Sequence, residues 1–308
     1  VCIQFPGSDS PNKDGTMSIP LITQEQMDRD AVFYGKDSLW FTMFNEGRMP
    51  RGQGSRRVMT RQMCSKFGAF NEPVFTDANR TTIAFLDAAY RGVGGDRCVF
   101  GTLEFGVETT AGDGEHPVSA IISQSAGVKQ NNQVLNLLGL KIVPIVAASN
   151  ELPEDQIVKF VREQCLYLGI SPADFYFDSG MRTSLVSAFA RQWSAEVNPI
   201  DCGGKASERS VSNDIKTSCR DYYFNFITEL WFNVRMTVET GQFRGMTDDV
   251  CEEFSVREWR IVGNNKIQVE PKEDMKMKTG RSPDLADAVA IGVHGAIRRG
   301  FRVQKLRA

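Results

Sequence analysis

The stretch KIQVEPKEDMKMKTGRSPDLADAVAIGVHGAIRR (266–299) decides the expected fold. Its first residues alternate as in a strand, its middle is rich in lysine, and its end has the apolar spacing of a helix. We expect Ser282 at the N-cap and Pro283 in the first turn of that helix. Asp284 and Asp287 then share one face of the helix. Because like charges on one face repel, they require a compensating cation.

Two further carboxylates stand where predicted strands end. Asp87 follows the apolar run of TTIAFLDAAY (81–90), and Asp178 lies near the end of DFYFDSG (174–180). An unpaired carboxylate carried into a core is costly, whereas a cation neutralises it. Acids converging from separate elements would form an oxygen-rich site for Mg²⁺ or Mn²⁺. Two such ions, about 4 Å apart, can promote phosphodiester hydrolysis.

Each acid also has an ordinary structural explanation. Asp284 is favourable in the first turn of a helix through the helix dipole. Asp178 precedes Ser179 and Gly180, where an aspartate is a typical turn residue. Taken one at a time, these positions leave both interpretations open.

The rest of the pattern predicts an α/β domain in which a mixed β-sheet is flanked by helices. Strands are expected at 96–109, 118–125 and 138–148, and a hairpin at 258–271 around Gly263, Asn264 and Asn265. Helices are expected at 153–170, at 183–193 and over most of 210–243.

Residues 1–80 are expected to form an extended linker segment before a domain of residues 81–308. The first 23 residues have the Pro and Gly content of a loop. Residues 24–47 have partly helical spacing. Residues 48–61 are basic and contain glycine.

Composition excludes several classes of site. Of the 308 residues, 41% are hydrophobic and the net charge is −2, so any contact with nucleic acid must come from a local patch. Seven scattered cysteines without a CxxC pair argue against a disulfide framework or a structural zinc site. No apolar run is long enough to cross a membrane. CGGKAS (202–207) lacks the full spacing of a P-loop, so we expect no ATP hydrolysis by this chain.

Three motifs together resemble the nuclease domain of tailed-phage large terminase subunits. The closing motif, KIQVEPKEDMKMKTGRSPDLADAVAI (266–291), is the most specific. FYFDSGMRTSLVSAF (175–189) and IAFLDAAYRGVGGDRCV (83–99) resemble the family's other two motifs, in the same order. FYGKDSLWFTMFNEGRMP (33–50) is similar to the segment that joins the family's ATPase and nuclease halves, so the ATPase half would lie upstream.

The resemblance implies an RNase H-like fold and an endonuclease that cuts concatemeric double-stranded DNA with two Mg²⁺ or Mn²⁺ ions. Carried over residue by residue, it makes Asp87, Asp178, Asp284 and Asp287 the catalytic metal ligands, without deciding between the last two. It also implies a portal protein and a small terminase subunit as partners, in the host cytoplasm, with transient attachment to the procapsid.

A basic segment before the final helix is a candidate for contacts with DNA phosphates. Its ordinary explanation is a solvated charged loop. The segment comprises Lys272, Lys276, Lys278 and Arg281.

Two other functions stay open. The first is a junction resolvase or transposase-type nuclease of the same fold, and the second is a non-enzymatic module that docks the packaging motor on the portal. One departure from the family is an extra β segment around 107–135. Glu104 is expected to be exposed, and His294 to be a packed helix residue and not a ligand.

Overall fold

The computed structural model describes the following residues: 23–34, 41, 45–47, 56–75, 80–90, 96–108, 133–146, 148–180, 183–212 and 216–304. The expected strand at 118–125 and most of the segments 107–135 and 33–50 lie outside these ranges. The chain divides into two compact units, Val1–Arg56 with Arg307–Ala308, and Arg57–Leu306. In the first unit, helix α1 (Gln24–Tyr34) carries the buried Asp30, which accepts a hydrogen bond from Asn45.

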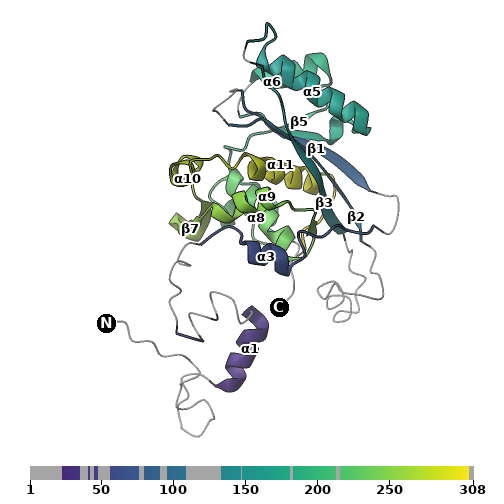
Figure 1. The fold of residues 1–308 in the computed structure, drawn as a ribbon. Helices are drawn as coiled ribbons and strands as arrows, with labels where there is room; N and C mark the ends of the chain where they lie inside the picture. Colours follow the sequence, from purple (N-terminus) through teal and green to yellow (C-terminus); the bar gives the residue numbers. More distant parts are fainter. Residues whose placement is uncertain are drawn as a thin grey trace. The chain divides into compact units, whose positions relative to one another are not determined.

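The second unit is built on one mixed sheet (Figure 1). Among the described residues its strands are β1 (Thr81–Asp87), β2 (Val99–Val107), β3 (Gln133–Ile142), β4 (Phe175–Asp178), β5 (Asn198–Ile200) and β6 (Phe243–Arg244). Their order is β5-β4-β1-β2-β3-β6. Strands β1, β2 and β3 are antiparallel, whereas β4 is parallel to β1 and β5 to β4. This is the mixed β-sheet flanked by helices that the sequence predicts.

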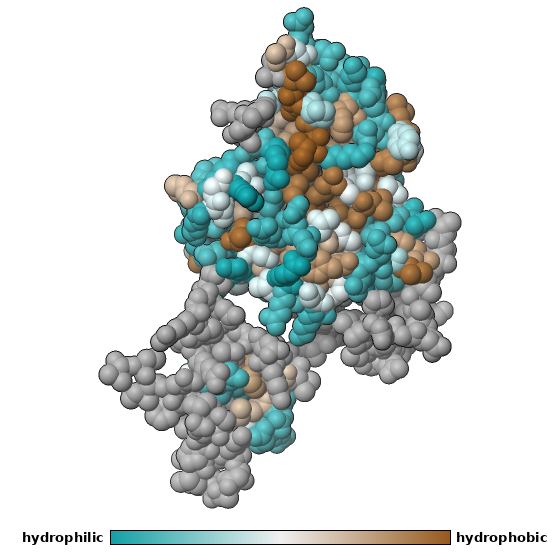
Figure 2. All heavy atoms as spheres, viewed as in Figure 1, coloured by the Kyte–Doolittle hydropathy of each residue, from teal (hydrophilic) through white to brown (hydrophobic). Residues whose placement is uncertain are grey.

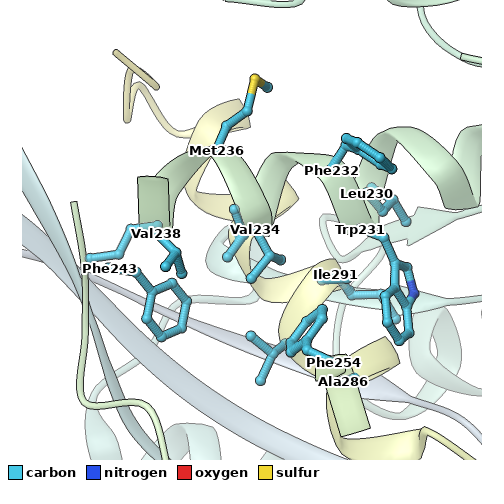
Figure 3. Close-up of a cluster of buried hydrophobic side chains, with 14 of the residues drawn as sticks. Leu230, Trp231, Phe232, Val234, Met236, Val238, Phe243, Phe254, Ala286 and Ile291 are labelled. Atoms are coloured by element: carbon cyan, nitrogen blue, oxygen red, sulfur yellow. The ribbon is translucent and has the colours of Figure 1, made fainter. Parts of the chain in front are cut away.

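Helices cover both faces of the sheet. They are α3 (Arg61–Lys66), α5 (Pro153–Leu168), α6 (Thr183–Gln192), α7 (Cys219–Tyr222), α8 (Phe226–Glu239), α9 (Asp248–Val256), α10 (Lys272–Thr279) and α11 (Asp284–Arg298). The side chains of β1 alternate, so Ile83 and Phe85 join the core under α8, α9 and α11. Ala84 and Leu86 join the core under α5 and α6. Figure 3 shows the first core, where α8 and α11 bring Trp231 and Ile291 together.

The hairpin expected at 258–271 is confirmed as β7 (Trp259–Val262) and β8 (Lys266–Val269), which pair antiparallel. Its turn uses positive φ at Asn264 and Asn265, which asparagine tolerates better than most residues. None of the helices within the described ranges could cross a lipid bilayer. The viewed surface mixes polar and apolar side chains, as Figure 2 shows.

Several boundaries differ from the expectation. The stretch 210–243 is not one helix, because Ser210 pairs with Ser218 in a β-bridge and α8 begins only after the N-cap Asn225. Helix α11 begins at Asp284, and its N-cap is Pro283 without a side-chain cap bond, so Ser282 is not the cap. Strand β3 begins at Gln133, before the expected 138, because it follows β2 along its whole length.

The larger unit begins at Arg57, earlier than the boundary near residue 80 that the sequence indicates. Val58 and Met59 are fully buried in the core under α8, α9 and α11, and the backbone N–H of Val58 donates to Arg257 O. This part of the expected linker therefore packs into the sheet domain through buried apolar side chains. The basic composition of 48–61 gives no sign of this burial.

Candidate active site

Three of the predicted acids meet at one edge of the sheet. Asp87 and Asp178 are the last residues of β1 and β4, which run parallel with Leu86 beside Phe177. Asp287 lies in the first turn of α11, which packs across β1. The three side chains line one cavity of about 420 Å³. Residues that are remote in sequence thus form the convergent set of carboxylates that the sequence predicts.

Asp284 has a different environment. It is 2% exposed, and its Oδ2 accepts hydrogen bonds from the backbone N–H and Nε of Arg97 at 2.9 and 3.3 Å. It lines a neighbouring cavity of about 1620 Å³ together with Arg97 and Glu253, and not the cavity of Asp87. The structure therefore separates the two acids of α11, which the helical spacing alone places on one face.

Lys272 contacts both acids of α11. Its Nζ lies 3.1 Å from Asp287 Oδ2 and 3.2 Å from Asp284 Oδ1. Burial alone would lower the pKa of Lys272, but the charges of Asp287, Asp87 and Asp284 raise it above its ordinary value. Lys272 therefore stays protonated among the carboxylates.

Three of the four basic residues, Lys272, Lys276 and Lys278, lie in helix α10 and not in a loop, whereas Arg281 follows its C-cap Gly280. Lys276 contacts Asp96, and Lys278 Nζ lies 2.5 Å from Glu270 and 3.4 Å from Glu258. Arg281 lines the larger cavity. Of the four cations, only Lys272 contacts Asp284 and Asp287 among the ion pairs of the described residues, whereas Lys276 and Lys278 pair with other acids.

The electrostatics of the small cavity favour a bound cation. Burial raises the pKa of Asp87 well above its ordinary value, and the neighbouring charges of Asp287, Asp178 and Asp284 raise it further, while Lys272 opposes them. Burial also raises the pKa of Asp178, although the backbone N–H of Gly180 donates to its Oδ1 at 3.0 Å. Carboxylates that are costly to ionise together are stabilised by a positive charge placed between them.

The donor chemistry fits Mg²⁺ or Mn²⁺, because all three donors are carboxylate oxygens. In the present arrangement, however, no three acidic, histidine or cysteine side chains of the described residues could hold one ion. The ammonium of Lys272 takes up the position beside Asp287. Its side chain is 27% exposed, so the ammonium is partly accessible from solvent.

Two contacts of Asp287 could not be found from the sequence. Trp231 Nε1 of α8 donates to Asp287 Oδ1 at 2.8 Å, and Arg257 Nη1 donates to the same oxygen at 3.3 Å. Burial lowers the pKa of Arg257, and the charge of Asp287 opposes this effect. No local pattern around either residue indicates the contact, because packing of α8, α9 and α11 creates it.

The sequence expectations for Glu104 and His294 can be compared with the structure. The expectation that Glu104 is exposed is wrong, because Glu104 is buried and bound by Arg80 at 3.3 Å and Asn136 at 3.2 Å. His294 is confirmed as a packed residue, in edge contact with Phe226, and burial lowers its pKa to about 4. The six described cysteines are free thiols.

Comparison with known proteins gives structural likeness only. No family model matches the chain, and no curated protein matches it in sequence. Solved structures that resemble it include nuclease domains of phage large terminase subunits. That of gp2 of bacterial virus Sf6 is 11% identical and covers 77% of this chain and 98% of its own, with a TM-score of 0.46. That of thermophilic phage G20c with bound magnesium is 10% identical (78% and 97%, TM-score 0.40), and that of Thermus phage P74-26 is 12% identical (74% and 91%, TM-score 0.36).

Proposed function

We propose that this chain is the metal-dependent endonuclease of a viral DNA-packaging terminase and cuts concatemeric double-stranded DNA. The observation that carries the proposal is the shared cavity of Asp87, Asp178 and Asp287, contributed by two parallel strands and one helix. The raised pKa of Asp87 supports it, since carboxylates gathered against their own repulsion are typical of functional sites.

Asp87, Asp178 and Asp287 would hold two Mg²⁺ or Mn²⁺ ions. Such ions supply Lewis acidity for the hydrolysis of a phosphodiester. The chain's own groups prepare the site, because the N–H of Gly180 orients Asp178, and Lys272 neutralises the acids while they are free of metal.

We assign Asp284 to the support of the site and not to direct ligation. It binds the ammonium of Lys272 and the guanidinium of Arg97. Arg97 in turn contacts Glu253, whose Oε2 accepts from the N–H of Ala286 at 2.9 Å. Asp284 thereby fixes the N-terminal end of α11, on which Asp287 stands.

DNA would be bound through its phosphates. Lys276, Lys278 and Arg281 surround the acids and could contact the backbone without reading sequence. Cleavage would then depend little on sequence. The portal protein, the small terminase subunit and the host cytoplasm belong to the same proposal and rest on the resemblance of the closing motif.

The test is cleavage of supercoiled plasmid and linear duplex by the unaltered chain in Mn²⁺, with and without EDTA. We expect cleavage that EDTA abolishes and that Asp178→Ala lowers by at least 100-fold, because a ligand is lost. The matched control is Asp221→Ala, since Asp221 is an exposed residue of α7.

Equal cleavage by the unaltered chain and Asp178→Ala would refute the assignment. A preference for branched junctions over linear duplex would instead favour the resolvase alternative. If Asp87→Ala and Asp178→Ala both left every function of the chain intact, the non-enzymatic docking module would be favoured.

A further inference from the structure

The two oxygens of Asp287 have different partners. Oδ1 accepts from the indole N–H of Trp231 at 2.8 Å and from Arg257 at 3.3 Å. Oδ2 contacts only Lys272 among the ion pairs of the described residues, at 3.1 Å. One side of the carboxylate is thus bound by an indole and a guanidinium, and the other side by an ammonium.

The partners of Oδ1 are held rigidly. Trp231 is fully buried and Arg257 is 3% exposed. The guanidinium carbon of Arg257 lies 4.3 Å from the centroid of the Trp231 ring, so the two groups stack. Arg257 Nε also donates to Glu270 O at 2.9 Å, and Phe254 packs against the indole at 4.7 Å between ring centroids (Figure 3).

The partner of Oδ2 is held less tightly. Lys272 has a flexible aliphatic stem and a side chain 27% exposed, and its ammonium is shared among Asp287, Asp284 and, at 3.7 Å, Asp96. Lys272 can therefore leave Oδ2, whereas Trp231 and Arg257 cannot leave Oδ1 without opening the core.

We propose that Trp231 and Arg257 are positioning residues that fix Asp287 so that it presents Oδ2 alone to the metal. This inference rests on the proposed function. Because Oδ1 already accepts from Trp231 and Arg257, Oδ2 is the oxygen that Asp287 would offer to a cation. Neither residue contacts the reacting atoms, and both act through Asp287.

The test compares two identical chemical changes in the full chain. Trp231→Phe removes the N–H donor to Asp287 and keeps an aromatic ring against Arg257. The matched control is Trp259→Phe, which removes an N–H that donates to a backbone carbonyl oxygen, that of Arg57, at 3.2 Å. Mn²⁺ affinity is measured without DNA, from the electron paramagnetic resonance signal of free Mn²⁺, and thermal melting reports folding.

We expect Trp231→Phe to bind Mn²⁺ about 10- to 100-fold more weakly, the usual effect of removing a group that orients a metal ligand. The concentration of Mn²⁺ that gives half-maximal cleavage should rise in parallel. Trp259→Phe should bind Mn²⁺ as the unaltered chain does. A purely structural role of Trp231 would lower the melting temperature and leave the Mn²⁺ affinity unchanged.

Arg257→Lys gives an independent measurement if Trp231→Phe does not fold. It keeps the positive charge but removes the planar fork, so Mn²⁺ affinity should again fall. Unchanged affinity in either folded variant would overturn the inference and leave the proposed function standing. Absence of Mn²⁺ binding by the unaltered chain would overturn both.

Discussion

Gly292→Ala perturbs the contact that brings the acids of the site together. Helix α11 passes so close to β1 that a Cβ at Gly292 would lie 2.5 Å from Cδ1 of Phe85 and 3.0 Å from Cδ2 of Leu103. Carbon atoms in ordinary contact are about 3.5 to 4.0 Å apart. The helix or the ring must therefore move by about 1 Å to accept a single methyl group.

The cost in stability is modest. Overpacking of a core costs about 1 to 3 kcal/mol. Alanine in a helix is about 1 kcal/mol more favourable than glycine. The free energy of unfolding should thus fall by about 2 kcal/mol or less, as the difference of these two contributions.

The cost in activity is larger. Asp287 stands about one and a half turns before Gly292 on the same helix, and Asp87 stands two residues after Phe85 on the strand beneath it. A shift at this contact therefore separates the two carboxylates. Misplacement of catalytic groups by about 1 Å can lower a rate by about 100-fold.

The assay is the initial rate of plasmid cleavage in Mn²⁺, beside the melting temperature. The matched control is Gly139→Ala in β3, where a new Cβ meets nothing within 4 Å. We expect Gly292→Ala to lose far more rate than stability and Gly139→Ala to lose neither. Unaltered cleavage by Gly292→Ala would refute the reasoning that this close approach sets the spacing of the acids.

Two further predictions concern charge. The folded state raises the pKa of Asp87 above its ordinary 3.8, so it binds the proton more tightly than the unfolded state, and stability falls as pH rises from about 4 through the folded-state pKa. At pH 8 without metal, Asp87→Asn should therefore have a higher melting temperature than the unaltered chain, and near pH 4 this difference should disappear. Added Mn²⁺ should raise the melting temperature of Asp87→Asn less than that of the unaltered chain. A lower melting temperature of Asp87→Asn at pH 8 would contradict this reasoning. Arg244 is 4% exposed and donates two hydrogen bonds of 3.2 Å to the carboxylate of Glu108. Arg244→Met leaves this carboxylate without its partner, so the free energy of unfolding in urea titration should fall by about 3 to 5 kcal/mol. The double variant Arg244→Met with Glu108→Gln should recover part of this loss, because the unpaired charge is removed.

The acids at strand ends could be predicted because burial and charge conflict within a few residues of sequence. Asp87 and Asp178 each follow an apolar run that only a buried strand explains. The choice between Asp284 and Asp287 could not be predicted in this way. Helical spacing puts both on one face, but tertiary packing places Asp287 in the cavity of Asp87 and Asp284 against Arg97.

Helices α9 and α10 were missed for different reasons. Helix α9 has a clear start, with Thr247 as N-cap and Asp248 and Asp249 in its first turn, and these capping residues could have revealed it. Helix α10 buries only Met275, so it has almost no apolar periodicity, and only Gly280 with its left-handed conformation marks its end. Contacts made by polar helices depend on tertiary packing and leave little trace in local sequence.

The support of Asp287 reaches the residues through which the chain enters the larger unit. The N–H of Val58 donates to the carbonyl oxygen of Arg257 at 2.9 Å, and Arg235 Nη1 donates to Val58 O at 3.1 Å. The same Arg257 binds Asp287 through its guanidinium. A chain begun at residue 81, where composition changes, would lack Val58 and leave the buried Arg257 without this donor. The first residues of the larger unit, which composition assigns to a linker, therefore bind the same residue that binds Asp287.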